Sequence, residues 1–147
     1  MAESARTLFL VRILQLEIYN RMVQRLAEVA LTPAQYMTLS LIARHEKCSS
    51  ADLARRARTT PQSMNETIAA LERSKLLARR ESPDHRRILH VRLTAAGARL
   101  VAKCESVIDE IERELFGAFS AKELAEFRAS LGKALAHCRP VEPAETE

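Results

Sequence analysis

The sequence predicts a mainly α-helical fold that carries one small β-hairpin. Two observations indicate helices: the 147 residues include only three Gly and five Pro, and apolar residues recur every three or four positions through most of the chain. A third indicates the hairpin, because between residues 89 and 93 apolar and polar residues alternate, as they do in a half-buried strand.

Residues 5–29 are predicted to form a long helix with an unusually wide apolar face. One stripe repeats at spacings of three and four, and further apolar residues widen it. A helix buried on one side only needs no such width, so this helix is expected to meet a partner. The stripe consists of Leu8, Val11, Leu14, Ile18, Met22 and Leu26, and the widening residues are Phe9, Ile13, Leu16 and Tyr19.

Three short helices are predicted to follow in close succession. Each begins after a hydroxyl residue that can cap a helix, and two of these residues precede a proline, which suits the first helical position. Gln35 stands where a capping box with Thr32 requires it. The predicted ranges are 33–44 after Thr32, 51–57 after Ser49 or Ser50, and 61–74 after Thr60.

A β-hairpin is predicted next, from strands at 76–81 and 88–93 that are joined by the loop 82–87. The second strand is expected to turn Leu89, Val91 and Leu93 toward the core. His90 and Arg92, on its other face, are expected to meet solvent or a ligand.

Two long helices are predicted to complete the ordered chain. Thr94 caps the first, whose apolar stripe runs for about five turns to Leu115. Ser120 and Glu123 form a capping box for the second, which is expected to end near Arg139 and Pro140.

Two short helices, a third with a polar outer face and then a hairpin follow the order of a winged helix-turn-helix. The predicted fold is therefore mainly α with a small two- to three-stranded β wing, dimeric through its N- and C-terminal helices. We expect a single domain over residues 1–147, with dimerisation helices at 1–30 and 100–138, a DNA-binding lobe at 31–97 and an acidic tail at 140–147. Since no membrane-spanning run or signal peptide is recognisable, a cytoplasmic protein is expected.

Charge is distributed unevenly along the chain. Residues 1–43 carry four Lys and Arg against three Asp and Glu, residues 44–103 carry fourteen against six, and residues 104–147 carry five against ten. The three segments therefore have net charges of +1, +8 and −5. A basic block beside an acidic one indicates a segment that meets a polyanion such as DNA, although a merely solvated basic surface would carry the same charge.

The helix at 61–74 is the predicted DNA-reading helix. Met64, Ile68 and Leu71 share one face and are expected to be buried. On the other faces, amide, hydroxyl and carboxylate groups can bond to base edges in the major groove, and the small Ala69 and Ala70 allow close approach. An ordinary solvated amphipathic helix is the alternative. The expected contacts are Gln62, Ser63, Asn65, Glu66 and Thr67 to bases, Arg73 to phosphate, and Ser49, Thr59 and Thr60 to the DNA backbone.

The loop between the two strands is the second predicted DNA contact. Its basic tip has the width to enter an adjacent minor groove, where narrow A·T segments concentrate negative potential. The alternative is a surface ion pair without any partner. The residues concerned are Asp84, His85, Arg86 and Arg87.

Several motifs around this hairpin resemble the multiple-antibiotic-resistance-regulator (MarR) family. They are Leu76-Leu77-x-Arg79, the Ser-Pro turn at 82–83, Arg87, and Leu93-Thr94-Ala95-Ala96-Gly97. The resemblance covers about residues 32–100 in motif and the whole chain in helix order. It implies a homodimeric repressor whose terminal helices dimerise, whose reading helix enters the major groove of a palindromic operator, and whose wing arginine, here Arg87 with Asp84 as its support, enters the minor groove.

The resemblance also implies an effector. Small phenolic or aromatic acids often bind such repressors between the dimer base and the DNA-binding lobe and release the operator. By analogy with relatives, the lining residues here would be Arg12, Tyr19, Tyr36, Met37 and His45, with a core or surface role as the alternative for each. The expected partners are double-stranded operator DNA, a second copy of the chain and a small aromatic effector, without a cofactor or a membrane.

Two positions depart from the family pattern. The usual Asp-x-Arg aligns with His85-x-Arg87, so the Asp is His here, while Asp84-x-Arg86 has the same spacing one residue earlier. Lys75 stands where the family usually has a Gly that closes the reading helix in a left-handed turn. A Lys in such a turn costs about 1 kcal/mol, unless the helix ends differently.

Other classes of function receive less support. An enzyme is not predicted, because the three glycines never cluster into a phosphate-binding loop and no nucleophile or zinc motif occurs. A metal site is not predicted either. A thiol-based redox-sensing repressor of the same fold and a helical protein-interaction module remain as alternatives. For the thiol switch, Cys104 is expected in the core, whereas Cys48 and Cys138 could be exposed.

Overall fold

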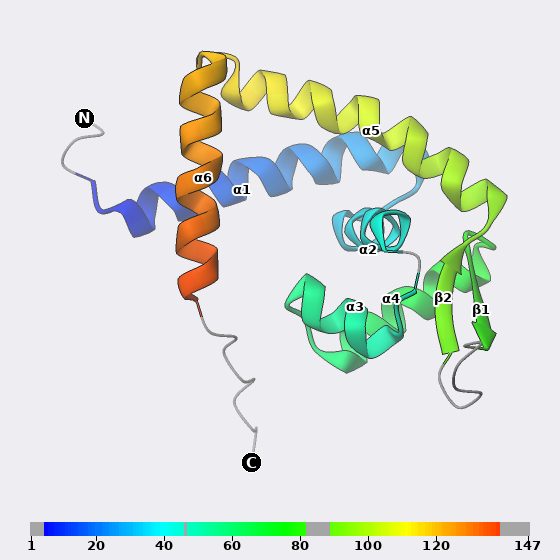
Figure 1. Ribbon diagram of the computed structural model, residues 1–147. Helices are drawn as coiled ribbons and strands as arrows, with labels where there is room; N and C mark the ends of the chain where they lie inside the picture. The colour runs from blue at the N-terminus through cyan, green and yellow to red at the C-terminus, as the bar shows by residue number, and fades with distance from the viewer. Residues whose placement is uncertain (1–4, 46, 82–88, 139–147) are drawn as a thin grey trace. The chain divides into compact units, whose positions relative to one another are not determined.

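The computed structural model describes residues 5–45, 47–81 and 89–138. The elements occur in the order expected from the sequence, and their ends agree to within a few residues (Figure 1). They are α1 (Thr7–Leu26), the 3₁₀ turn η2 (Ala27–Val29), α2 (Pro33–Arg44), α3 (Ser50–Ala57), α4 (Pro61–Arg73), β1 (Leu77–Glu81), β2 (Leu89–Leu93), α5 (Ala95–Phe116) and α6 (Ala121–His137). The mainly helical fold with a β wing is therefore confirmed.

The chain divides into two compact units, one up to residue 111 and one from residue 112 onward. The second unit contains the end of α5 and all of α6. In it, the rings of Phe116, Phe119 and Phe127 pack on one another with centroids 5.6–6.1 Å apart. Arg128 also donates a hydrogen bond to Glu112 over 2.8 Å. These contacts close the turn that joins the two helices.

The helix starts are closed by the side chains that the sequence indicates. The Thr32 hydroxyl accepts a hydrogen bond from the backbone N–H of Gln35, and the Gln35 side chain accepts one from the N–H of Thr32. The same reciprocal box joins Ser120 to Glu123. Ser49, rather than Ser50, caps α3 through a box with Asp52. Each box satisfies two N–H groups that a helix start leaves unpaired, and each contributes about 1 kcal/mol.

The core of the first unit is assembled mainly from the three short helices and the hairpin. Every one of these elements supplies at least one side chain that is almost fully buried, and α1 and α5 close the core from their own sides. The shared core stabilises helices that are too short to persist alone. Its most buried large side chains are Leu26, Leu39, Leu53, Ile68, Leu71, Val91, Thr38 and Cys104.

The two strands form an antiparallel sheet in which Leu77 pairs with Leu93 and Glu81 with Leu89. Val91 is buried as predicted, at 1% exposure. The prediction that Leu89 packs inward is wrong, because this residue is 43% exposed. It pairs at the end of the described ladder that is farthest from the core, where no helix covers it.

A third segment joins the sheet at a single position. The backbone N–H of Val91 donates to the carbonyl of Cys48 over 2.9 Å, which forms an isolated antiparallel bridge. This pairing places Cys48 in the core at 3% exposure, so the sequence-based expectation that its thiol could be exposed is wrong.

The start of α5 is held against the end of β1's approach segment by a compact set of hydrogen bonds. The N–H of Thr94 donates to the carbonyl of Leu76 over 3.0 Å, and the Thr94 hydroxyl donates to the carbonyl of Lys75 over 2.8 Å. The same hydroxyl accepts from the N–H of Gly97 over 3.0 Å. A Cβ at Gly97 would lie 2.1 Å from the Leu76 carbonyl oxygen, so only glycine permits this approach.

The left-handed turn after α4 is present although Lys75 occupies it. Lys75 has a φ of 58°, a region that L-residues with a Cβ disfavour. Its N–H donates to the carbonyl of Glu72, and the N–H of Leu76 donates to that of Leu71, both within 3.0 Å. The helix therefore ends as it would with glycine, at a backbone cost of about 1 kcal/mol.

Gly97→Ala is expected to lower the free energy of unfolding by about 1–3 kcal/mol, because the new methyl group would overlap a backbone carbonyl. Urea denaturation at fixed chain concentration measures the change. Gly132→Ala is the matched control, since nothing described lies within 4 Å of its Cβ position and alanine favours a helix interior by about 1 kcal/mol. Equal unfolding free energies for the two variants would contradict the packing argument.

Lys75→Gly is expected to raise the free energy of unfolding by about 1 kcal/mol, because glycine adopts a φ of 58° without a Cβ clash. Ser74→Gly is the control, because Ser74 has a φ of −78° and donates to the carbonyl of Ala70. That variant should be less stable than the parent. A destabilised Lys75→Gly in the same urea titration would show that the lysine side chain outweighs the backbone strain.

Candidate nucleic-acid interface

Helix α4 separates an apolar from a polar side as the sequence predicts. Met64, Ile68 and Leu71 are at most 2% exposed, so the predicted buried face is confirmed. The side chains proposed to touch DNA lie on the accessible sides of the helix: Gln62, Ser63, Asn65, Glu66 and Arg73 are exposed and Thr67 is half-buried. The anchored face fixes the helix, and the other sides remain available to a partner.

Some of these polar groups already have partners. Gln62 Nε2 donates to Glu66 Oε1 over 3.3 Å, one turn further along the helix. The Thr67 hydroxyl donates to the carbonyl of Ser63 over 2.9 Å. Because the Gln62 contact is long and exposed, its amide can exchange Glu66 for a base edge at little cost.

The start of α4 presents a different picture from the one expected for phosphate contacts. The Thr60 hydroxyl accepts from the N–H of Ser63 and donates to the Ser63 hydroxyl over 2.9 Å. The Ser49 hydroxyl donates to the carboxylate of Asp52 over 2.7 Å. Both hydroxyls are therefore engaged in capping, while Thr59 is exposed in the turn between α3 and α4.

The base of the hairpin is fastened to α4 by an ion pair that the sequence reading did not anticipate. Arg79 Nε on β1 donates to both carboxylate oxygens of Glu72, over 3.1 and 3.2 Å. Both side chains are about one-third exposed, so the pair is screened in part and its value is below about 1 kcal/mol. The pair's role is geometric, since it links the reading helix to the strand that leads into the predicted wing tip.

The predicted wing-tip residues, Asp84, His85, Arg86 and Arg87, lie outside the described residues. The part of the hairpin that is described carries further basic groups on one face. Arg80 pairs with His90 across the sheet and Ala78 pairs with Arg92, which places all four side chains on the same side. Arg80 and Arg92 are exposed, and the Nδ1 atom of His90 is buried without a hydrogen-bond partner among the described residues.

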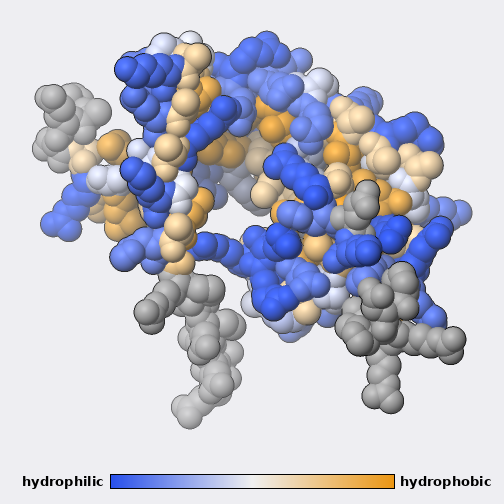
Figure 2. All heavy atoms as spheres, viewed as in Figure 1, coloured by the Kyte–Doolittle hydropathy of each residue, from blue (hydrophilic) through white to orange (hydrophobic). Residues whose placement is uncertain are grey.

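Helix α3 adds more positive charge next to the reading helix. Arg55 pairs with Asp52, and Arg56 lies 3.3 Å from the Nε2 atom of His45 at the end of α2. Arg58 occupies the turn after α3 with a left-handed φ of 51°. Hydrophilic side chains dominate the visible surface over α3 (Figure 2). The net charge of +8 between residues 44 and 103, from fourteen basic and six acidic residues, is thus concentrated around the helix-turn-helix.

The five residues named as a possible effector lining lie in different surroundings. Tyr36 is 4% exposed, and its hydroxyl donates to Glu105 Oε1 on α5 over 3.0 Å. Burial, together with the Glu105 carboxylate, raises the pKa of Tyr36 to about 12. Tyr19 and Met37 are each 49% exposed. Of the other two, Arg12 donates to the side chain of Gln15 and His45 lies against Arg56.

The three thiols differ in accessibility. Cys48 and Cys104 are buried, and Cys138 is exposed. Burial raises the pKa of the Cys104 thiol, which disfavours the reactive thiolate. Within the described ranges, no cluster of three His, Cys, Asp or Glu is placed to hold a metal ion. No described helix is both long and apolar enough to cross a bilayer.

Comparison with known proteins agrees with this architecture. The family model described as the MarR family matches residues 31–88. The HTH-type transcriptional repressor Rv2887 of Mycobacterium tuberculosis is 32% identical over 108 residues, which cover 74% of this chain and 78% of that repressor.

Two solved structures extend the match to nearly the whole chain. The S. aureus MepR–DNA complex has a TM-score of 0.81 at 26% identity and covers 92% of this chain and 100% of the other. The Mycobacterium tuberculosis MarR family protein Rv2887, in complex with salicylic acid, has a TM-score of 0.72 at 28% identity and covers 91% and 99%. By its sequence relatives and its winged helix-turn-helix fold, this chain belongs to the MarR family.

Proposed function

We propose that the protein is a sequence-specific DNA-binding repressor that acts as a homodimer and is released from its operator by a small aromatic or phenolic ligand. The observation that carries this proposal is the division of α4 into a buried apolar face and accessible polar sides, next to a hairpin in a basic lobe. That arrangement is what a helix needs in order to enter a major groove while staying fixed to its domain. No catalytic activity is part of the proposal.

In this proposal the base contacts come from Gln62, Ser63, Asn65, Glu66 and Thr67. Gln and Asn can bond to adenine in two places, and Glu can accept from cytosine. Ala69 and Ala70 follow on the same helix and are small enough to let its first turns approach the bases. The relative Rv2887 is named a transcriptional repressor and MepR has been solved with DNA, which supports the same use of this fold here.

Contacts to the DNA backbone are proposed for a second group of residues. Arg73 at the end of α4 would meet a phosphate, as would Ser49, Thr59 and Thr60 near the helix starts. Wing residues Asp84 to Arg87 would reach the adjacent minor groove, with Arg87 as the inserted side chain.

Dimerisation is proposed to bury the apolar face of α1. In the part of the chain that the structure describes, this helix exposes eight large apolar side chains, from 40% for Leu16 to 74% for Leu8. Exposed apolar surface of that extent is costly in water and marks an interaction surface. A two-fold dimer would place the two reading helices one turn of DNA apart, about 34–36 Å, on a palindromic operator. The eight residues are Leu8, Phe9, Leu10, Val11, Ile13, Leu16, Tyr19 and Val23.

Release by an effector is supported by the complex of Rv2887 with salicylic acid. Arg12, Tyr19, Tyr36, Met37 and His45 remain the proposed lining if the effector binds beside α1 and α2. Redox control receives less support, because two of the three thiols are buried.

Gln62→Ala is expected to reduce the preference for operator over random DNA by about 1–3 kcal/mol, because the side chain would read one base pair. Fluorescence anisotropy of labelled duplexes from the gene's upstream region and of random duplexes, at two salt concentrations, measures both affinity and selectivity. Wild-type affinity should fall with salt by about 0.9 log units per neutralised phosphate for each log unit of salt.

Arg73→Ala is the matched contrast on the same helix. A phosphate contact carries no sequence information, so this variant should lose affinity equally on all duplexes and show a salt slope smaller by about one. The proposal for Gln62 fails if its variant shows that same uniform loss. Binding by the wild type that does not discriminate any upstream duplex from random DNA would count against an operator-binding repressor.

Ile13→Glu is expected to weaken the dimer at least about tenfold, because it places a charge in the proposed apolar interface. Sedimentation velocity over a range of concentrations measures the dissociation constant. Asn20→Glu, an exposed polar position on the same helix, is the control and should stay dimeric. A monomeric wild type, or an unchanged dissociation constant for Ile13→Glu, would contradict the proposed interface.

A further inference from the structure

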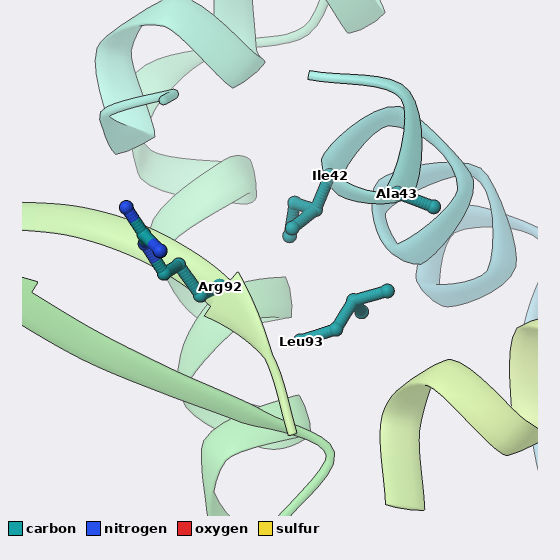
Figure 3. Close-up of a pocket in the computed structure, with 4 residues that line it drawn as sticks. All are labelled: Ile42, Ala43, Arg92 and Leu93. Atoms are coloured by element: carbon teal, nitrogen blue, oxygen red, sulfur yellow. The ribbon is translucent and has the colours of Figure 1, made fainter. Parts of the chain in front are cut away.

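A pocket of about 260 Å³ lies between the end of α2 and the end of β2 (Figure 3). Ile42 and Ala43 line it from the helix, and Arg92 and Leu93 line it from the strand. None of these four residues belongs to the effector lining considered above. The pocket is somewhat smaller than the roughly 300–1,000 Å³ typical of drug-sized ligand sites, so it suits a compact molecule.

The lining combines an apolar wall with one cationic group. Ile42 is 3% exposed and Leu93 is half-buried, whereas Ala43 and Arg92 are exposed. The apolar side chains therefore form the inner wall and the guanidinium lies where the pocket meets solvent. A molecule that fits both features has a flat apolar body and a single negative charge at one end.

Arg92 differs from the arginine that serves the fold. Arg79, on the other face of the hairpin, is bonded to both carboxylate oxygens of Glu72. In the described part of the chain, by contrast, no carboxylate lies within ion-pair distance of Arg92. Its guanidinium keeps the paired donors that match the two oxygens of a carboxylate.

We infer that this pocket binds a small aromatic carboxylate, with its ring against Ile42, Ala43 and Leu93 and its carboxylate on Arg92. The pocket uses both chemical halves of such a molecule, whereas a DNA phosphate would use the arginine alone. The inference rests on the proposed function only for the consequence of binding, since the occupancy of the pocket can be measured without DNA.

The position of the pocket gives binding a route to DNA affinity. β2 is the second strand of the hairpin, it bridges to Cys48 through Val91, and it leads through Thr94 into α5. A ligand wedged between α2 and β2 would change the position of the hairpin relative to the helix-turn-helix. Because groove contacts require both parts in register, occupancy should weaken operator binding.

Benzoate is the probe for the test, with neutral benzamide as its isosteric control. Isothermal titration calorimetry on the full-length protein should show benzoate binding and a benzamide affinity at least about tenfold lower, since the charged contact is lost. Arg92→Gln should lower the affinity for benzoate by a similar factor. Arg80→Gln removes an arginine from the same face of the hairpin and should leave benzoate affinity unchanged.

A second variant tests the apolar wall without touching the charge. Ala43→Leu places a larger side chain at the mouth of the pocket, at an exposed helical position where folding is unaffected. It should lose benzoate binding and retain the wild-type melting temperature and DNA affinity. In anisotropy assays, saturating benzoate should weaken operator binding by the wild type and by Arg80→Gln, and leave Ala43→Leu unaffected.

Two results would overturn the inference. Equal benzoate affinity in the wild type, Arg92→Gln and Ala43→Leu would place any benzoate site elsewhere. Unchanged benzoate affinity in Arg92→Gln together with weaker DNA binding and a smaller salt slope would make Arg92 a phosphate contact instead. A protein that binds benzoate through Arg92 and Ala43 but has no selective DNA binding would uphold the pocket and refute the proposed function.

Discussion

The close approach of α5 to the backbone at Leu76 is the constraint on which the first unit depends. One hydroxyl, that of Thr94, caps α5 and at the same time bonds to the carbonyls of Lys75 and Leu76. Gly97 makes the approach possible because it has no Cβ. The long helix, the end of α4 and the start of the hairpin are thus joined at one point, and the direction in which the hairpin leaves the core follows from it.

From this joint outward, the reading helix is held by contacts that spare its accessible sides. Met64, Ile68 and Leu71 anchor α4 in the core, Thr60 caps its start, and the Glu72–Arg79 pair fastens its end to β1. None of these contacts needs the polar groups that are proposed to read bases. Stability and recognition are therefore separated on a single helix, which allows the reading side chains to vary at little cost in folding.

The apolar surface of α1 has the opposite character, because its stability depends on a partner. Only Leu26 of this helix is buried within the chain, and its N-terminal half presents apolar side chains to solvent. α6 likewise has no buried residue within the chain. The proposed dimer would cover such surfaces, so that assembly and the spacing of two reading helices would be set by the same contacts.

The sequence by itself determined the features that depend on neighbours a few residues away. The caps at Thr32 and Ser120 act over three residues, and the buried face of α4 repeats with the helical period, so both could be predicted. Tertiary structure alone decided the burial of Cys48, which pairs with Val91 far along the chain, and the pocket that Ile42 shares with Arg92. No local pattern encodes such contacts, because they depend on how separate elements pack, and packing is specified by the whole core at once.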